Sequence, residues 1–255
     1  MDDGRVQCQS YVLTLSAYHI PLSVDPGVFT MTDKQKSREA LNLPQDKIIF
    51  TFLSDRLDNK RKGLEILLQS INLLPEEDKS KVLIVNIGQG DYHLPSVVNV
   101  GRISDQKKIA QILSASDALM LPSREDNFPN VMLEANACGC PVIAFPVGGI
   151  REFIKEGFNG LMAKEVSAKS FKEILQTFVR EKPSFDRAQI REHVVTTYSP
   201  ARQAESYISF IKKLLSNNSS YLLYKTKTRI LLSAISAFFL SVMIRIDLSL
   251  VRKQM

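Results

Sequence analysis

The stretch that decides the fold is residues 118–145, ALMLPSREDNFPNVMLEANACGCPVIAF. Its first apolar run, 118–121, predicts a buried strand that Pro122 and Ser123 close. A polar loop follows, and residues 131–137 then read as a helix. A second apolar run, 141–145, predicts another strand. A strand, a helix and a strand in this order form a βαβ unit, in which the two strands are parallel.

The rest of the chain repeats this alternation of short apolar runs and amphipathic segments. We expect strands at 47–53, 81–87 and 97–101. We expect helices at 63–74, 105–115, 188–197 and 201–215, the last two closing the domain. The unit pattern continues to about residue 178. The sequence therefore predicts an α/β fold, a Rossmann-like parallel sheet with helices on both faces, followed by a helical C-terminal extension.

Charge and cysteine content narrow the classes of partner. The chain of 255 residues has 33 Lys and Arg against 27 Asp and Glu, a net charge of +6, which favours anionic ligands such as phosphates. The basic residues are scattered without interleaved aromatic residues, so we expect no nucleic acid partner. The acidic start, Met1-Asp2-Asp3, does not resemble a signal peptide, and three cysteines cannot all pair with one another. A reduced, cytoplasmic location is the simplest expectation.

Metal chemistry is not indicated by the sequence. The three histidines, His19, His93 and His193, lack the spacing of metal ligands, and the spacing of Cys138 and Cys140 lacks the second ligand pair of a closed zinc site. No hydrolase triad, Walker loop or zinc finger pattern is present. We therefore expect no metal.

The helix that begins near Asn130 follows directly on a strand and a loop with carboxylates. A helix N-terminus presents unpaired backbone N–H groups and a partial positive charge, which together favour a phosphate. Glu134 lies one turn into this helix, and a carboxylate can accept hydrogen bonds from both hydroxyls of a ribose. This pattern indicates a nucleotide site.

The same passage resembles the E-x7-E signature of the GT4 class of retaining glycosyltransferases, which have the GT-B fold. The second acid of the signature matches Glu134, and the first, eight residues earlier, matches Asp126; Glu125 is the alternative at a spacing that the family does not use. The resemblance implies that Glu134 binds the donor ribose and that Asp126 lies near hydroxyls of the transferred sugar. It also implies donor contacts from the loop and helix start, at Phe128, Pro129, Asn130 and Val131.

A second match precedes the helix at 63–74. Arg56 and Lys62 resemble the two cations with which the family holds the donor diphosphate. Arg61 is the alternative to Lys62, because the separation of Arg56 and Lys62 is one residue longer than the common pattern of the family. Fixed cations of this kind stabilise the charge that develops on the departing phosphate. Further donor contacts are expected at the turn of Gly88 and Gly90 and at Arg102, where the family places its base-contacting loop.

The resemblance covers residues 20–215 and implies the C-terminal, donor-binding domain of a two-domain enzyme. Residues 1–45 are then a residual N-terminal segment and interdomain linker, 46–215 the nucleotide-sugar-binding domain, and 216–255 a polar break with an apolar and basic tail. We expect a transferase that uses a UDP- or GDP-sugar, either a truncated form or a donor subunit that needs a separate acceptor-domain subunit. The alternative is a non-catalytic binding or scaffold protein.

The tail contains fifteen uncharged residues, 230–244, between basic residues. A membrane-spanning helix needs about 20 apolar residues, so this run is short for a span. Flanking cations and aromatic residues are typical of helices that lie in the membrane interface. We therefore expect peripheral membrane contact through residues 225–255, at the cytoplasmic face.

Overall fold

The computed structural model describes residues 20–56, 59–89 and 96–216. Their sheet is six-stranded, with every pair of neighbours parallel, in the order β3-β2-β1-β4-β5-β6. The strands are β1 (Ile48–Arg56), β2 (Val82–Gln89), β3 (Val97–Gly101), β4 (Ala118–Leu121), β5 (Val142–Ala144) and β6 (Gly160–Met162). This is the doubly wound order, in which the direction of winding reverses between β1 and β4. Ligands of such sheets bind outside the carboxyl ends of the strands at that reversal.

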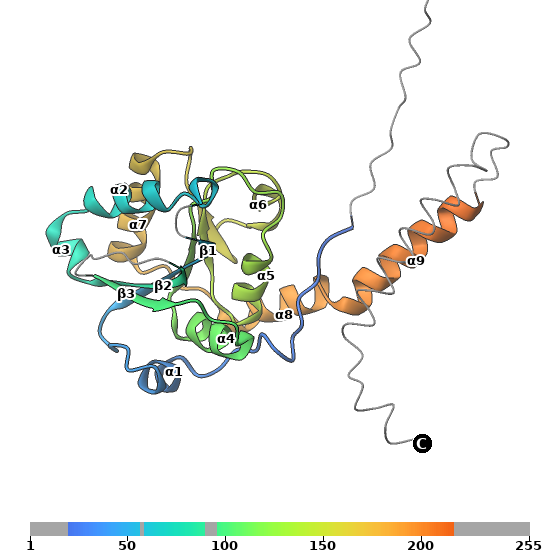
Figure 1. The fold of residues 1–255 in the computed structure, drawn as a ribbon, viewed down its shortest axis with the longest axis horizontal. Helices are drawn as coiled ribbons and strands as arrows, with labels where there is room; N and C mark the ends of the chain where they lie inside the picture. Colours follow the sequence, from blue (N-terminus) through green and yellow to red (C-terminus); the bar gives the residue numbers. More distant parts are fainter. Residues whose placement is uncertain (1–19, 57–58, 90–95, 217–255) are drawn as a thin grey trace, which may run out of the picture. The chain divides into compact units, whose positions relative to one another are not determined.

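The helices follow the strands along the chain. They are α1 (Lys34–Ala40), α2 (Leu64–Asn72), α3 (Glu76–Lys79), α4 (Gln106–Ala115), α5 (Asn130–Ala137), α6 (Ile150–Phe153), α7 (Ala168–Glu181), α8 (Arg187–Thr197) and α9 (Pro200–Ser216), with a 3-10 turn η1 (Lys60–Lys62). Figure 1 shows α2, α3 and α7 on one face of the sheet and α1, α4 and α5 on the other. Helices therefore cover both faces, which confirms the predicted fold class.

The two faces of the sheet are separate apolar layers because successive strand residues point in opposite directions. Phe50 and Met120 face α2 and α7 in one cluster, whereas Leu119 and Leu121 pack with α4, α5 and α8 in the other. All four side chains are at most 2% exposed. The apolar runs predicted as strands are thus buried on both faces, as parallel strands are.

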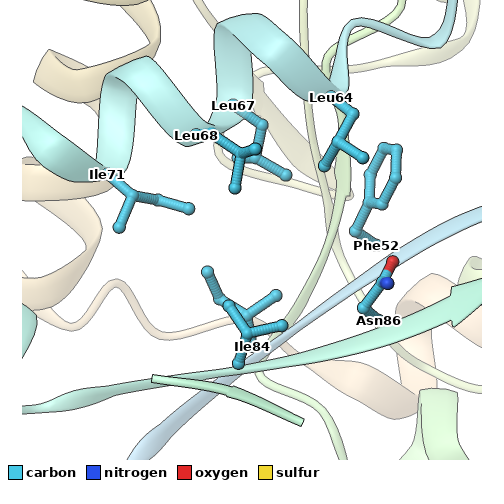
Figure 2. A pocket seen from close by; sticks show the side chains of 8 residues that line it. Phe52, Leu64, Leu67, Leu68, Ile71, Ile84 and Asn86 are labelled. Carbon is cyan, nitrogen blue, oxygen red and sulfur yellow. The ribbon is translucent and has the colours of Figure 1, made fainter. Parts of the chain in front are cut away.

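One polar side chain interrupts the layer under α2. Figure 2 shows Asn86 of β2 beside Phe52 and Leu64, at a cavity of about 10 Å³, roughly the space of one water molecule. Asn86 Nδ2 donates to Asn99 Oδ1 at 2.8 Å, whereas its Oδ1 is buried without a hydrogen-bond partner among the described residues. A nucleotide does not fit here.

Two features of the structure differ from the predictions, the end of β2 and the burial of α9. The strand β2 continues through Gly88 to Gln89, so the predicted turn at Gly88 is wrong. Helix α9 forms, but none of its side chains between 200 and 207 is buried, and Tyr207 is 40% exposed. This part of the helix, which was expected to close the domain, therefore adds no buried side chain to the core. Among the described residues, 20–207 belong to one compact unit and 208–216 to a second; the predicted membrane-contacting tail, residues 225–255, lies outside the described residues.

Candidate functional site

The loop between β4 and α5, residues 122–129, is held at the carboxyl edge of the sheet by two other loops. On one side, the Arg124 N–H donates to Arg61 O at 2.8 Å, and on the other, Gly149 N–H donates to Asn127 O at 2.6 Å. Both neighbouring loops approach the backbone of the 122–129 loop closely, at glycines with positive φ.

The close approach explains why glycine stands at both places. A Cβ on Gly63, where φ is +72°, would lie 1.8 Å from Pro122 O, and a Cβ on Gly148, where φ is +49°, would lie 1.8 Å from Asp126 O. No side chain fits at such distances, and L-residues rarely adopt such φ values. These two glycines therefore fix the position of the 122–129 loop.

The structure brings two of the predicted residues into direct contact. Lys62 Nζ lies 2.8 Å from Asp126 Oδ2, although 64 residues separate them. Their side chains are 29% and 12% exposed, respectively. Ser123, whose side chain is fully buried, places its Oγ 3.5 Å from the same carboxylate oxygen. Lys62, the cation expected to hold the phosphate, and Asp126, the carboxylate expected to lie near the sugar, thus form an ion pair in this structure.

The alternatives to these two residues do not share this contact. Glu125 and Arg61 are both exposed, and among the described residues neither side chain takes part in an ion pair. Lys62 and Asp126 therefore remain the better candidates for the two roles, and their functions stay predictions.

Helix α5 supplies the second part of the site. Its N-cap residue is Pro129, and no side chain caps the helix, so its first backbone N–H groups point at the edge of the sheet without a capping acceptor. Glu134 lies one turn further, and burial raises the pKa of its carboxyl to about 7. No described side chain pairs with this carboxylate. The loop that holds Asp126 therefore leads into an uncapped helix end, and one turn further along the helix lies an acid that is largely removed from water.

Three of the four remaining predicted residues, at the end of the loop and the start of the helix, pack inward. Phe128 packs edge-on against Phe153, with the ring centroids 5.9 Å apart, and lies 6.0 Å from the ring of Tyr198. Pro129 and Val131 are buried, and Asn130 is exposed. The first three side chains therefore hold the helix end in place, and a ligand can meet mainly the backbone there and the side chain of Asn130.

The other predicted donor contacts lie on three neighbouring strands. Arg56 ends β1, the strand beside β4, and its side chain is exposed. Gly88 is buried within β2, and Gly90 lies outside the described residues. Arg102 follows β3 and is exposed, but β3 is three strands from β4, about 14 Å at the usual strand spacing. Arg56 is thus placed to act with Lys62, whereas Arg102 can reach only the far end of a long ligand.

A cavity larger than the one beside Asn86 lies elsewhere in the described residues. It has a volume of about 350 Å³ and is lined by residues of α1, β2, β3 and α4, including Val98, Val100 and Lys108 but none of the predicted site residues. In the part of the chain that the structure describes, no three His, Cys, Asp or Glu side chains gather as metal ligands, and no helix is long and apolar enough to cross a membrane.

Comparison with known proteins identifies the family to which the sequence is similar. Residues 33–194 match the family model for glycosyl transferases group 1. The chain is 30% identical over 162 residues to D-inositol 3-phosphate glycosyltransferase of Actinosynnema mirum, covering 56% of this chain and 38% of that protein. The chain spans about two fifths of the length of the curated relatives that it matches.

Solved structures share the fold. Sucrose-phosphate synthase of Thermosynechococcus elongatus has a TM-score of 0.62 at 25% identity, covering 77% of this chain and 52% of that one. Alr3699/HepE of Anabaena, solved in complex with UDP-glucose, has a TM-score of 0.61 at 19% identity over 74% of this chain and 56% of that one.

Proposed function

Because the chain belongs to the family of group 1 glycosyl transferases, we propose that it binds a nucleotide sugar at the carboxyl edge of its sheet and transfers the sugar to an acceptor with retention of configuration. The single observation that carries this proposal is the Lys62–Asp126 ion pair, in which Asp126 belongs to the loop that leads directly into the uncapped start of α5. Positive charge, a helix N-terminus and two acids with different surroundings then share one edge at the point where the sheet reverses its winding.

Each part of the site suits one part of the donor. The diphosphate fits between the cations Arg56 and Lys62 and the N–H groups of α5, because a helix N-terminus favours phosphate. The ribose hydroxyls fit the dehydrated carboxylate of Glu134, which lacks a described partner and accepts well from two donors. Asp126 is left for hydroxyls of the transferred sugar.

The same groups assist the reaction. As the bond between the sugar and the diphosphate breaks, negative charge grows on the departing phosphate. Fixed cations and backbone N–H groups aimed at that charge lower the barrier without reorganising. Because Arg56 and Lys62 can supply this positive charge, the proposal needs no metal ion.

The proposed donor nucleotide is UDP or GDP. Gly88, near the end of β2, and Arg102, just after β3, are the proposed contacts of the base, as is Gly90, which lies outside the described residues. A complex of Alr3699/HepE with UDP-glucose makes UDP the first nucleotide to test.

We assign acceptor binding to a part outside the described domain. The chain spans about two fifths of the length of its curated relatives. A separate acceptor-binding subunit or domain that orients the acceptor against the donor can lower the barrier by several kcal/mol, up to about 7–11 in well-oriented models. The proposal therefore includes an acceptor-binding part, either in a longer form of this chain or in a separate subunit.

Calorimetric titration with UDP-glucose and GDP-mannose tests donor binding. The wild type should bind one of them, and Glu134→Gln should bind it at least about tenfold more weakly, since a hydrogen bond to a charged group contributes about 1.5–3 kcal/mol. The matched control is Glu173→Gln, which removes an exposed glutamate of α7 and should bind like the wild type.

Transfer is then assayed with and without proteins that copurify with the chain. Turnover that depends on such a partner would support the donor-subunit form of the proposal. Binding without turnover under any condition would favour the non-catalytic binding module, and no binding of either nucleotide sugar by the wild type would refute the donor site altogether.

A further inference from the structure

The ion pair between Lys62 and Asp126 joins two groups that the proposed function assigns to different parts of the donor. Lys62 is expected to hold the diphosphate, and Asp126 is expected to accept hydrogen bonds from the sugar. In this structure their charged atoms are 2.8 Å apart. A lysine carries one compact charge, so Lys62 cannot neutralise Asp126 and the diphosphate equally well at the same time.

We propose that the donor binds by an exchange of ion pairs. The ammonium of Lys62 leaves Asp126 and pairs with the donor diphosphate, and the freed Asp126 carboxylate then accepts hydrogen bonds from hydroxyls of the sugar. Asp126 thereby becomes a specificity residue that favours an intact nucleotide sugar over a nucleoside diphosphate. This inference rests on the proposed function and adds to it a coupling between the two halves of the donor.

The geometry indicates which partner moves. Asp126 is 12% exposed, and its carboxylate lies 3.5 Å from the buried hydroxyl of Ser123. The backbone of Asp126 is held against Gly148, with no room for even a Cβ between them. Lys62 is more exposed, at 29%, and its ammonium sits on a flexible four-carbon stem. The carboxylate is therefore the fixed group and the ammonium the mobile one.

The discrimination follows from what replaces Lys62 beside Asp126. A nucleotide sugar brings hydroxyl donors to the carboxylate, so the carboxylate is paired again after the exchange. A nucleoside diphosphate brings none, and it would leave a largely buried carboxylate unpaired near its own negative charge, which is unfavourable. The product nucleotide should therefore bind less tightly than the donor, which favours its release.

The test compares UDP with UDP-glucose, or GDP with GDP-mannose, by calorimetry on the wild type and on Asp126→Asn. Asparagine keeps the shape of the side chain but cannot form the ion pair. We expect Asp126→Asn to bind the nucleoside diphosphate about fivefold to tenfold more tightly than the wild type does, and to gain less or lose affinity for the nucleotide sugar. Glu125→Gln removes the same charge one residue away and should leave both affinities unchanged.

The same substitution made in a Lys62→Gln variant distinguishes ion-pair exchange from simple repulsion between Asp126 and the diphosphate. In Lys62→Gln there is no ammonium to release, so adding Asp126→Asn should improve binding of the nucleoside diphosphate much less than it does in the wild type. An equal gain in both backgrounds would show that Asp126 acts only by repulsion and would overturn the exchange.

Two other outcomes are equally clear. An Asp126→Asn variant with unaltered or weaker binding of the diphosphate would also overturn the exchange while leaving the donor site intact. If neither the wild type nor any variant binds a nucleotide, the proposed function fails together with the exchange. Circular dichroism and thermal melting of each variant report whether it remains folded.

Discussion

Replacing Glu134 by glutamine removes a carboxyl that α5 holds largely out of water. Burial raises the pKa of this carboxyl from its ordinary value of 4.5 to about 7. One pKa unit corresponds to about 1.4 kcal/mol, so the charged form costs the folded protein about 3 kcal/mol above pH 7. Glutamine has nearly the same shape and carries no charge. The ligand-free variant should therefore be more stable than the wild type at high pH.

The direction of the pH effect follows from the two states of the wild type. Below pH 4.5 the carboxyl is protonated in both the folded and the unfolded protein, and its charge costs nothing. Between pH 4.5 and about 7 the unfolded chain loses the proton while the folded protein keeps it, so the stability of the wild type falls across this window. Above pH 7 the difference is constant.

Urea unfolding of both proteins at pH 4 to pH 8 measures the effect. The free energy of unfolding of Glu134→Gln minus that of the wild type should grow by about 3 kcal/mol from pH 4 to pH 8. Any contribution of the new amide itself is the same at every pH and does not affect this change. The exposed Glu173 on α7 is the control, and Glu173→Gln should differ from the wild type by less than about 0.5 kcal/mol throughout. A difference for Glu134→Gln that is the same at every pH would refute the reasoning.

Three further outcomes are expected. Affinity for a nucleotide sugar should rise about tenfold from pH 6 to pH 8 in the wild type, since a carboxyl with a pKa of about 7 ionises over this range, and calorimetry of Glu134→Gln should show no such rise. Gly148→Ala, whose Cβ would lie 1.8 Å from Asp126 O, should lower the melting temperature far more than Gly157→Ala, which has similar positive φ but open space around it. Asp78→Asn should destabilise the protein at pH 7, because hydrogen bonds from Arg180 and Gln176 outweigh burial and hold the pKa of Asp78 below 3.8; in denaturation curves this loss should shrink as the pH falls through that lowered pKa.

The elements that sequence patterns predicted best are those with dense apolar runs. The strands at 97–101 and 118–121 coincide with β3 and β4, because β-branched and apolar residues bounded by Gly or Pro leave little choice of structure. Helix α1 was not predicted, since KQKSREA has no apolar periodicity. Its stability comes from tertiary contacts: Arg38 is 4% exposed and donates to Ala115 O and to Asp117.

Two short elements were missed for a related reason. Strand β6 has three residues and α6 has four, too few for a periodicity to be visible, whereas the equally short β5 lies in a longer apolar run. Glycine stands at position 160, the start of β6, because a Cβ there would lie 2.2 Å from Val142 O. That requirement arises from the neighbouring strand and not from the local sequence.

Some features of the candidate site follow from the local sequence, and others depend on the tertiary structure. The sequence by itself determined the α/β alternation, the helix start after Pro129 and the position of Glu134 one turn into α5, because these depend on local pattern and spacing. Only the tertiary structure decided that Lys62 pairs with Asp126, that Gly63 and Gly148 hold the loop between them, and that Glu134 is dehydrated. Residues 64 positions apart meet because the sheet order places β1 beside β4, and the burial that raises a pKa is a property of the packed interior rather than of the chain.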